Sequence, residues 1–159
     1  MAPGSAGHQY REALLLRTLV NNPWLIEDIA EELANTQFRS PAFASLRDAL
    51  LAASADEKSL DTSTLRNHLK ASGFAPNLQQ AERMATNKCH AFAEPDADRV
   101  IVENGWRHTL SLHQQQSLRD QLAEADREYR QTLDEDALAR ILELQQLITT
   151  IVPKEAAFE

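Results

Sequence analysis

The stretch after Pro95 constrains the fold most, because it continues to Gln131 without another proline and with a single glycine, Gly105. A run without helix breakers predicts one long helix, and Asn104–Gly105 is its expected point of bending. At about 1.5 Å per residue this helix extends roughly 50 Å, more than a small bundle needs. Its middle, Gln114–Gln116, is polar on every side, which is typical of a helix that bridges two bodies through solvent.

The part before Pro95 is also rich in helix signals. The chain of 159 residues has 4 glycines and 6 prolines, and its apolar residues recur at helical spacing instead of alternating. Five helices are expected: residues 8–20, one that starts after Asn22–Pro23, one that starts after Ser40–Pro41, one from Asp61 to Gly73, and one that begins near Asn77. The side chains expected to be buried are Leu25, Ile29 and Leu33 in the second helix and Phe43, Leu46, Leu50 and Ala53 in the third. In the fifth helix they are Leu78, Ala81, Ala85, Cys89 and Phe92. The expected end signals are caps at Asn22 and Asp61, a hydrophobic staple between Leu60 and Leu65, and a left-handed Gly73 with Phe74 folded back on Leu69.

The C-terminal part is expected to form a helical hairpin. Thr132–Glu135 has capping-box spacing, and Leu133 with Leu138 forms a staple if Asp134 is the cap instead. The last helix then runs to about Thr150, antiparallel to the end of the long helix. The sequence therefore predicts an all-α fold, in which a compact helical bundle is joined by a long helix to a C-terminal helical hairpin. The predicted divisions are a disordered leader (1–7), the bundle with the start of the long helix (8–112), the hairpin (113–152) and a tail (153–159).

The two helices of this hairpin are unequal in apolar surface. The last helix has apolar residues around a wide arc, while the end of the long helix offers a narrow stripe that finishes at Tyr129. We therefore expect several side chains among Ile141, Leu142, Leu144, Leu147 and Ile148 to face water. Each contributes roughly 1.5–3 kcal/mol when it is buried, so three or four could anchor a micromolar contact. Docking on another protein, folding back on the bundle and self-association are the alternatives.

The charge of the chain limits its partners. The formal net charge is -8 and the sequence pI about 5.1, with 16 basic residues spread among 24 acidic ones, so we expect little direct binding of nucleic acid. No run approaches ~18 consecutive apolar residues, so no membrane span is expected. The single cysteine, Cys89, is typical of a reducing compartment, and the start lacks the features of a signal peptide. We expect a cytoplasmic location.

Spacings that would support chemistry are missing from the sequence. The five histidines and Cys89 include no pair at the separations that bring metal ligands to one helix face. We interpret Cys89 as a buried thiol and the histidines as surface groups. No nucleophile elbow or phosphate-binding glycine loop occurs, so no catalytic residue is predicted. Trp106 is expected to seat the long helix on the bundle.

Two segments carry a resemblance to a known family. They are Leu14-Leu-Leu-Arg-Thr-Leu-Val-Asn-Asn-Pro-Trp-Leu25 and, in the hairpin, Ala139-Arg-Ile-Leu-Glu-Leu-Gln-Gln-Leu147. With the order of helices from His8 to about Thr150, the chain resembles the C-terminal helicase-binding domain of bacterial DNA primase. The nearest alternatives are the N-terminal domain of a replicative helicase and an unrelated regulatory helical dimerisation domain. The long helix and the hairpin after the fifth helix favour primase.

The resemblance implies different roles for the hairpin and the bundle. The hairpin, about Ala125–Ile151, would dock on the N-terminal domain of the hexameric replicative helicase, and the bundle from His8 to Phe92 would modulate helicase activity and primer synthesis. The implied contact residues are Tyr129, Leu138, Ile141, Leu142, Gln145 and Ile148. The parent would be a DNA primase, a nucleotidyltransferase that uses zinc and magnesium. This fragment, without the zinc-ribbon and polymerase domains, is expected to hold no cofactor and make no primers.

A second partner is also implied by the resemblance. Such domains in some bacteria bind the acidic C-terminal tail of single-stranded DNA-binding protein. The matching positions are His8, Arg11 and Arg17, with Arg83 and Lys88 as candidate neighbours. A tail that ends in a carboxylate requires cations beside an apolar slot, and His8 offers at most a partial charge.

Overall fold

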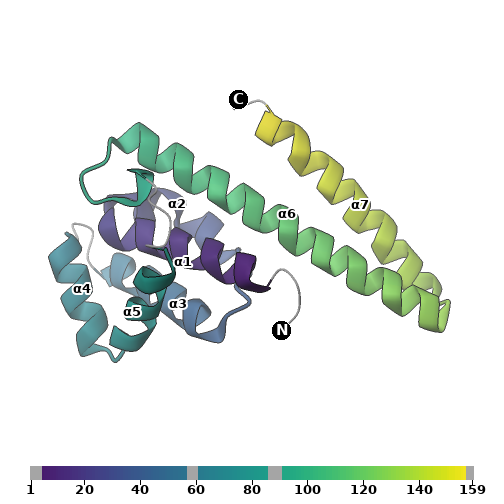
Figure 1. The fold of residues 1–159 in the computed structure, drawn as a ribbon, viewed down its shortest axis with the longest axis horizontal. Helices are drawn as coiled ribbons and strands as arrows, with labels where there is room; N and C mark the ends of the chain where they lie inside the picture. The colour runs from purple at the N-terminus through teal and green to yellow at the C-terminus, as the bar shows by residue number, and fades with distance from the viewer. Residues whose placement is uncertain (1–4, 57–60, 86–90, 157–159) are drawn as a thin grey trace. The chain divides into compact units, whose positions relative to one another are not determined.

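The computed structural model describes residues 5–56, 61–85 and 91–156, with side chains from His8 to Thr150 within these ranges. The elements are α1 (Ser5–Asn21), α2 (Trp24–Ala34), α3 (Pro41–Asp56), α4 (Thr62–Ala71), α5 (Ala75–Ala85), the 3-10 helix η1 (Ala91–Ala93), α6 (Arg99–Thr132) and α7 (Glu135–Ala156) (Figure 1). Every described element is helical, which confirms the all-α prediction. The chain forms two compact units, Met1–Thr109 and Leu110–Glu159.

The first unit is built around α1, which packs against α2, α3, α4, α5 and η1. Leu15, Leu16 and Leu19 on α1 are completely buried. Leu15 and Leu19 are one turn apart on the same face, while Leu16 lies about 100° around the helix from Leu15, so the buried arc is wide, as expected of a helix surrounded by others. The sequence of α1 therefore makes it the centre of the bundle.

The predicted buried stripes and two of the predicted helix ends are confirmed. The expected positions of α2, α3 and α5 are all buried, namely Leu25, Ile29, Leu33, Phe43, Leu46, Leu50, Ala53, Leu78, Ala81 and Ala85. The carboxylate of Asp61 accepts the Thr64 N–H at 2.7 Å and caps α4. Gly73 has φ 90°, and the Phe74 N–H donates to the Leu69 carbonyl at 2.9 Å, which closes the helix. The predicted burial of Cys89 and the staple at Leu60 lie outside the described residues.

Four predicted boundaries are wrong. Helix α1 begins at Ser5 instead of about His8. Helix α5 begins at Ala75, two residues before the expected start near Asn77, because the missing N–H of Pro76 is tolerated in the first turn. Helix α6 begins at Arg99 instead of just after Pro95, because Asp98 caps it by accepting the Val100 N–H at 2.9 Å. Helix α7 continues to Ala156 instead of Thr150, and Pro153 in its last turns removes a single helical N–H.

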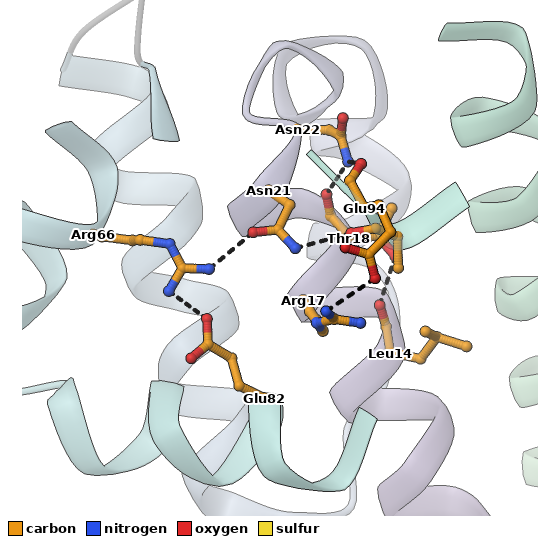
Figure 2. Close-up of polar contacts among 9 residues, drawn as sticks. Leu14, Arg17, Thr18, Asn21, Asn22, Arg66, Glu82 and Glu94 are labelled. Atoms are coloured by element: carbon orange, nitrogen blue, oxygen red, sulfur yellow. Dashed lines mark hydrogen bonds and ion pairs between the residues drawn. The ribbon is translucent and has the colours of Figure 1, made fainter. Parts of the chain in front are cut away.

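Asn22 does not cap α2, contrary to the prediction. Its Nδ2 donates to the Thr18 carbonyl at 3.0 Å and to the Glu94 carbonyl at 3.3 Å, so the amide closes the end of α1 instead (Figure 2). Its neighbour Asn21 donates from Nδ2 to the Ala93 carbonyl at 2.9 Å. The two amides therefore hold η1 and the residue after it against α1. A single sequence shows the capping residue type but not this distant partner.

Two arginines complete this polar network (Figure 2). Arg66 on α4 donates to Oδ1 of Asn21 at 2.8 Å and pairs with Glu82 on α5. Arg17 on α1 pairs with the carboxylate of Glu94 at 3.2 Å. The end of α1 is thus tied to α4, α5 and the segment that follows η1.

The start of α6 is fixed on the first unit by three contacts. Trp106 is completely buried and donates from Nε1 to the Leu15 carbonyl at 3.2 Å, which confirms its predicted role. Arg107 donates to both carboxylate oxygens of Glu32, at 2.7 and 2.6 Å. These hydrogen bonds raise the pKa of Arg107. Phe92 of η1 lies directly against Gly105. Phe92 was expected on the fifth helix, but the described α5 ends at Ala85, and Phe92 is half-buried.

Candidate protein-interaction surface

The turn between α6 and α7 is built by local hydrogen bonds. The Leu133 N–H donates to the Tyr129 carbonyl at 2.8 Å, which ends α6, and Leu133 itself has φ 52°. The carboxylate of Asp134 accepts the Asp136 N–H at 3.1 Å, and the Asp134 carbonyl accepts the Leu138 N–H. Of the two predicted caps, the structure thus has Asp134 and not Thr132.

The two helices of the second unit share a small core. Ala125 on α6 and Ile141 and Leu144 on α7 are buried together, with exposed fractions of 3%, 8% and 2%. The partly buried side chains packed against them are Leu118, Leu122 and Tyr129. The small side chain at Ala125 leaves room for the larger ones of α7. Of the five residues among which several were expected to face water, Ile141 and Leu144 are therefore buried, and Ile141, an implied contact residue, does not lie on the surface.

Leu142 and Leu147 remain exposed, as predicted, and Leu138 and Leu133 are exposed as well. Leu142 is 59% exposed, Leu147 44%, Leu138 39% and Leu133 72%. Leu138 and Leu142 are one turn apart and form a continuous ridge on α7. Leu147, five residues after Leu142, lies roughly 140° further around the helix and so on another side. The structure brings the candidate residues Leu138 and Leu142 together with the exposed Gln145, while Tyr129 and Ile148 are half-buried.

The segment that contains the Leu138–Leu142 ridge is acidic, and by helical spacing Asp134 and Glu135 lie beside the ridge while Asp136 and Glu143 lie on the side of Leu147. Asp134, Glu135, Asp136 and Glu143 are all exposed. Arg140 is the one basic residue of this segment, and its guanidinium donates to Oε1 of Gln121 on α6 at 2.9 Å. Carboxylates at the start of α7 are favoured by the helix dipole, so they serve local stability as well. The exposed leucines therefore lie within a negative field.

The residues implied for binding a carboxylate tail do not form an open cationic site. His8 is 1% exposed, one turn before the buried Glu12, whose carboxylate accepts the backbone N–H groups of Arg39 and Ser40 at 3.1 and 3.0 Å. Arg17 is paired with Glu94, and Arg11 is half-buried. Arg83 is exposed, and the other candidate neighbour, Lys88, lies outside the described residues. The assignment of His8 to such a site is corrected, because the helix begins before it and includes it in the buried face.

Two other expectations about polar residues are also wrong. His113 is 1% exposed and Gln115 is 5% exposed, although both were expected at the surface. His113 lies three residues after the buried Leu110, and therefore continues the buried face of α6. His68 and His108 are exposed as expected, and His90 lies outside the described residues. Polar residue type alone did not reveal which positions follow a buried stripe.

The described part of the chain shows neither a membrane span nor a metal site. Within residues 5–56, 61–85 and 91–156, none of the helices has the length and apolarity to cross a membrane. The same part of the chain contains no grouping of three or more histidine, cysteine, aspartate or glutamate side chains suited to a metal ion. Comparison of the chain with protein-family models, curated proteins and solved structures finds no match. The exposed ridge of α7 is the candidate surface that remains.

Proposed function

We propose that this chain is a helicase-interaction domain of a bacterial DNA primase. Its hairpin docks the primase on the N-terminal domain of the hexameric replicative helicase in the cytoplasm, and its bundle modulates helicase and priming activity. The polymerase chemistry, with its zinc and magnesium, belongs to other domains of the parent primase. The observation that carries the proposal is the exposure of Leu138 and Leu142 on a hairpin whose own core is already filled.

The energetic argument concerns the ridge formed by Leu138 and Leu142. Leu142 is 59% exposed, and no described residue of the core formed by Ala125, Ile141 and Leu144 covers it. Burying a leucine against a partner contributes roughly 1.5–3 kcal/mol, and hot-spot residues of this kind dominate binding energies. A docking partner therefore gains more from this ridge than from any polar side of the hairpin.

Charge supports a protein partner over a nucleic acid. Asp134 and Glu135 beside the ridge, with Asp136 and Glu143 on the same segment of α7, would repel phosphates. The residues implied for the tail of single-stranded DNA-binding protein do not support such a site, because His8 is buried and Arg17 already pairs with Glu94. The family resemblance of the Leu14–Leu25 and Ala139–Leu147 segments supplies the identity of the partner.

The test is a change of charge on the ridge. Leu142→Asp should abolish association with the purified replicative helicase, because it places a carboxylate in the apolar contact. Circular dichroism should show unchanged helicity, since Leu142 contributes nothing to the core of the hairpin. Association is measured by isothermal titration calorimetry and by the mass of the complex in size-exclusion chromatography.

The matched control is Leu147→Asp, which makes the same change at an exposed leucine on another side of α7. It should bind helicase as the wild type does. Equal affinities of the wild type and Leu142→Asp would refute the placement of the interface. A wild-type chain that forms a dimer and ignores helicase would refute the proposed function itself.

A further inference from the structure

Leu133, at the turn of the hairpin, combines two features that a turn residue normally avoids. It is a bulky residue with φ 52°, the single non-glycine residue with positive φ among those the structure describes. It is also 72% exposed, the largest value among the exposed large hydrophobic side chains of the described residues. Glycine or asparagine would adopt this conformation more easily and would be better solvated. The fold of the hairpin therefore gives no reason for a leucine here.

We infer that Leu133 is an anchor of the docking surface, and that the surface fits an apolar depression edged by lysine and arginine on the helicase. This inference rests on the proposed function and extends its interface to the turn. With Asp134 as the cap of α7, Leu133 lies just before the helix and Leu138 in its second turn, so both are at the same end of the hairpin. Leu142 follows one turn later. We call Leu133, Leu138 and Leu142 the tip ridge.

The tip ridge lacks cover from its own hairpin. The hairpin core consists of Ala125, Ile141 and Leu144 with three partly buried neighbours, and no member of the tip ridge belongs to it. A staple normally buries both of its leucines, yet Leu133 and Leu138 remain 72% and 39% exposed. Three exposed apolar side chains thus lie close together in the sequence at the turn end of α7, one more than the pair on α7 alone.

The charges around the tip ridge indicate the kind of partner. From Leu133 to Glu143 the chain has four carboxylates, Glu143 included, and all are exposed. Its one arginine, Arg140, donates a hydrogen bond from its guanidinium to Gln121. Just before the turn, Arg130 pairs with Asp126 at 3.1 Å. A second copy of this hairpin would bring like charges together, which is unfavourable. A partner surface with an apolar centre and a basic edge would complement both the exposed leucines of the tip ridge and the carboxylates of this segment.

The test replaces Leu133 with asparagine in the full chain. Leu133→Asn should bind the replicative helicase hexamer of the same bacterium about tenfold more weakly, as expected of a central apolar anchor. Its midpoint of thermal unfolding should stay the same or rise, because asparagine tolerates the left-handed conformation. A purely structural leucine would not show this combination. The control Leu147→Asn changes another exposed leucine and should not weaken binding.

The basic edge is tested with salt and with neutralised carboxylates. Raising the NaCl concentration from about 50 to about 300 mM should weaken the wild-type complex, since the screening length shortens. The double variant Glu135→Gln with Asp136→Asn should lose most of this salt dependence. Glu135 and Asp136 lie in the first turn of α7, so circular dichroism of the variant checks that the helix is retained.

The outcomes separate the two proposals. A wild-type chain that does not bind helicase overturns both. If the wild type binds, Leu142→Asp fails to bind and Leu133→Asn binds as the wild type does, Leu133 is no anchor while the proposed function stands. If the affinity is independent of salt, or if the neutralised variant keeps the wild-type salt dependence, the basic edge of the partner surface is refuted.

Discussion

Replacing Gly105 with alanine should destabilise the first unit, although alanine is the better helix former. The new methyl group would lie 2.7 Å from Cβ of Phe92 and would overlap its ring atoms Cγ and Cδ1. These atoms are at the base of the side chain, so a change of rotamer has to displace η1 or expose the ring. Overpacking of this kind costs about 1–3 kcal/mol, and the gain in helix propensity is about 1 kcal/mol. We expect a net loss near 1–2 kcal/mol because the overlap is severe.

Urea unfolding followed by tryptophan fluorescence measures this loss for the first unit, since Trp24 and Trp106 both lie in it. The physical reason is tested in the background of Phe92→Ala. With the ring removed, Gly105→Ala should become neutral or stabilise by up to about 1 kcal/mol. A stabilising effect in the wild type, or the same penalty in both backgrounds, would refute the close approach of Phe92 as the cause.

Two carboxylates give further predictions. Glu12→Gln should lower the free energy of unfolding by about 1–3 kcal/mol, because an amide has one acceptor oxygen for the N–H groups of Arg39 and Ser40. Burial raises the pKa of Glu12 above 4.5. The stability that this shift contributes is therefore fully present below pH 4.5 and is lost as the pH rises through the folded-state pKa. In urea unfolding, the difference in stability between the wild type and Glu12→Gln should narrow as the pH rises over this range. Asp61→Ala should lower the thermal midpoint at neutral pH, while Asp61→Asn should not, because asparagine caps as well. The bond from Thr64 lowers the pKa of Asp61 below 3.8, so the alanine penalty should fade in a thermal scan as the pH falls through the lowered value.

Signals confined to a few neighbouring residues were predicted well from the sequence. Asp61 caps a helix through a residue three positions on, and Gly73 closes it through a bond between adjacent turns. The buried stripe of α3, from Phe43 to Ala53, follows from helical periodicity alone. All of these depend on spacing within a turn or two, which a single sequence contains.

Side chains whose role depends on distant partners were predicted poorly. Asn22 has the residue type of a cap, but its amide bonds to the Glu94 carbonyl, 72 residues away. His8 has the residue type of a surface group, yet the buried face of α1 includes it. Ile141 and Leu142 are adjacent and equally apolar, and the packing of Ala125 determines which of them is buried. For the candidate surface, the sequence predicted that leucines are exposed but missed Leu133, whose positive φ was visible only in the structure.

The ties between α1 and later parts of the chain have a consequence for synthesis. Helix α1 is synthesised before the residues that complete its hydrogen bonds, because the carbonyl of Leu15 accepts from Trp106, 91 residues later, and Asn21 donates to Ala93, 72 residues later. Closing such long loops is entropically costly and precedes the gain from the contacts. On the ribosome, helices α2 to α5 can cover most of α1 early, but the part of α1 that contacts η1 and Trp106 stays uncovered until those residues have emerged. Nascent-chain pulldowns should find a chaperone on the arrested chain that ends before Trp106.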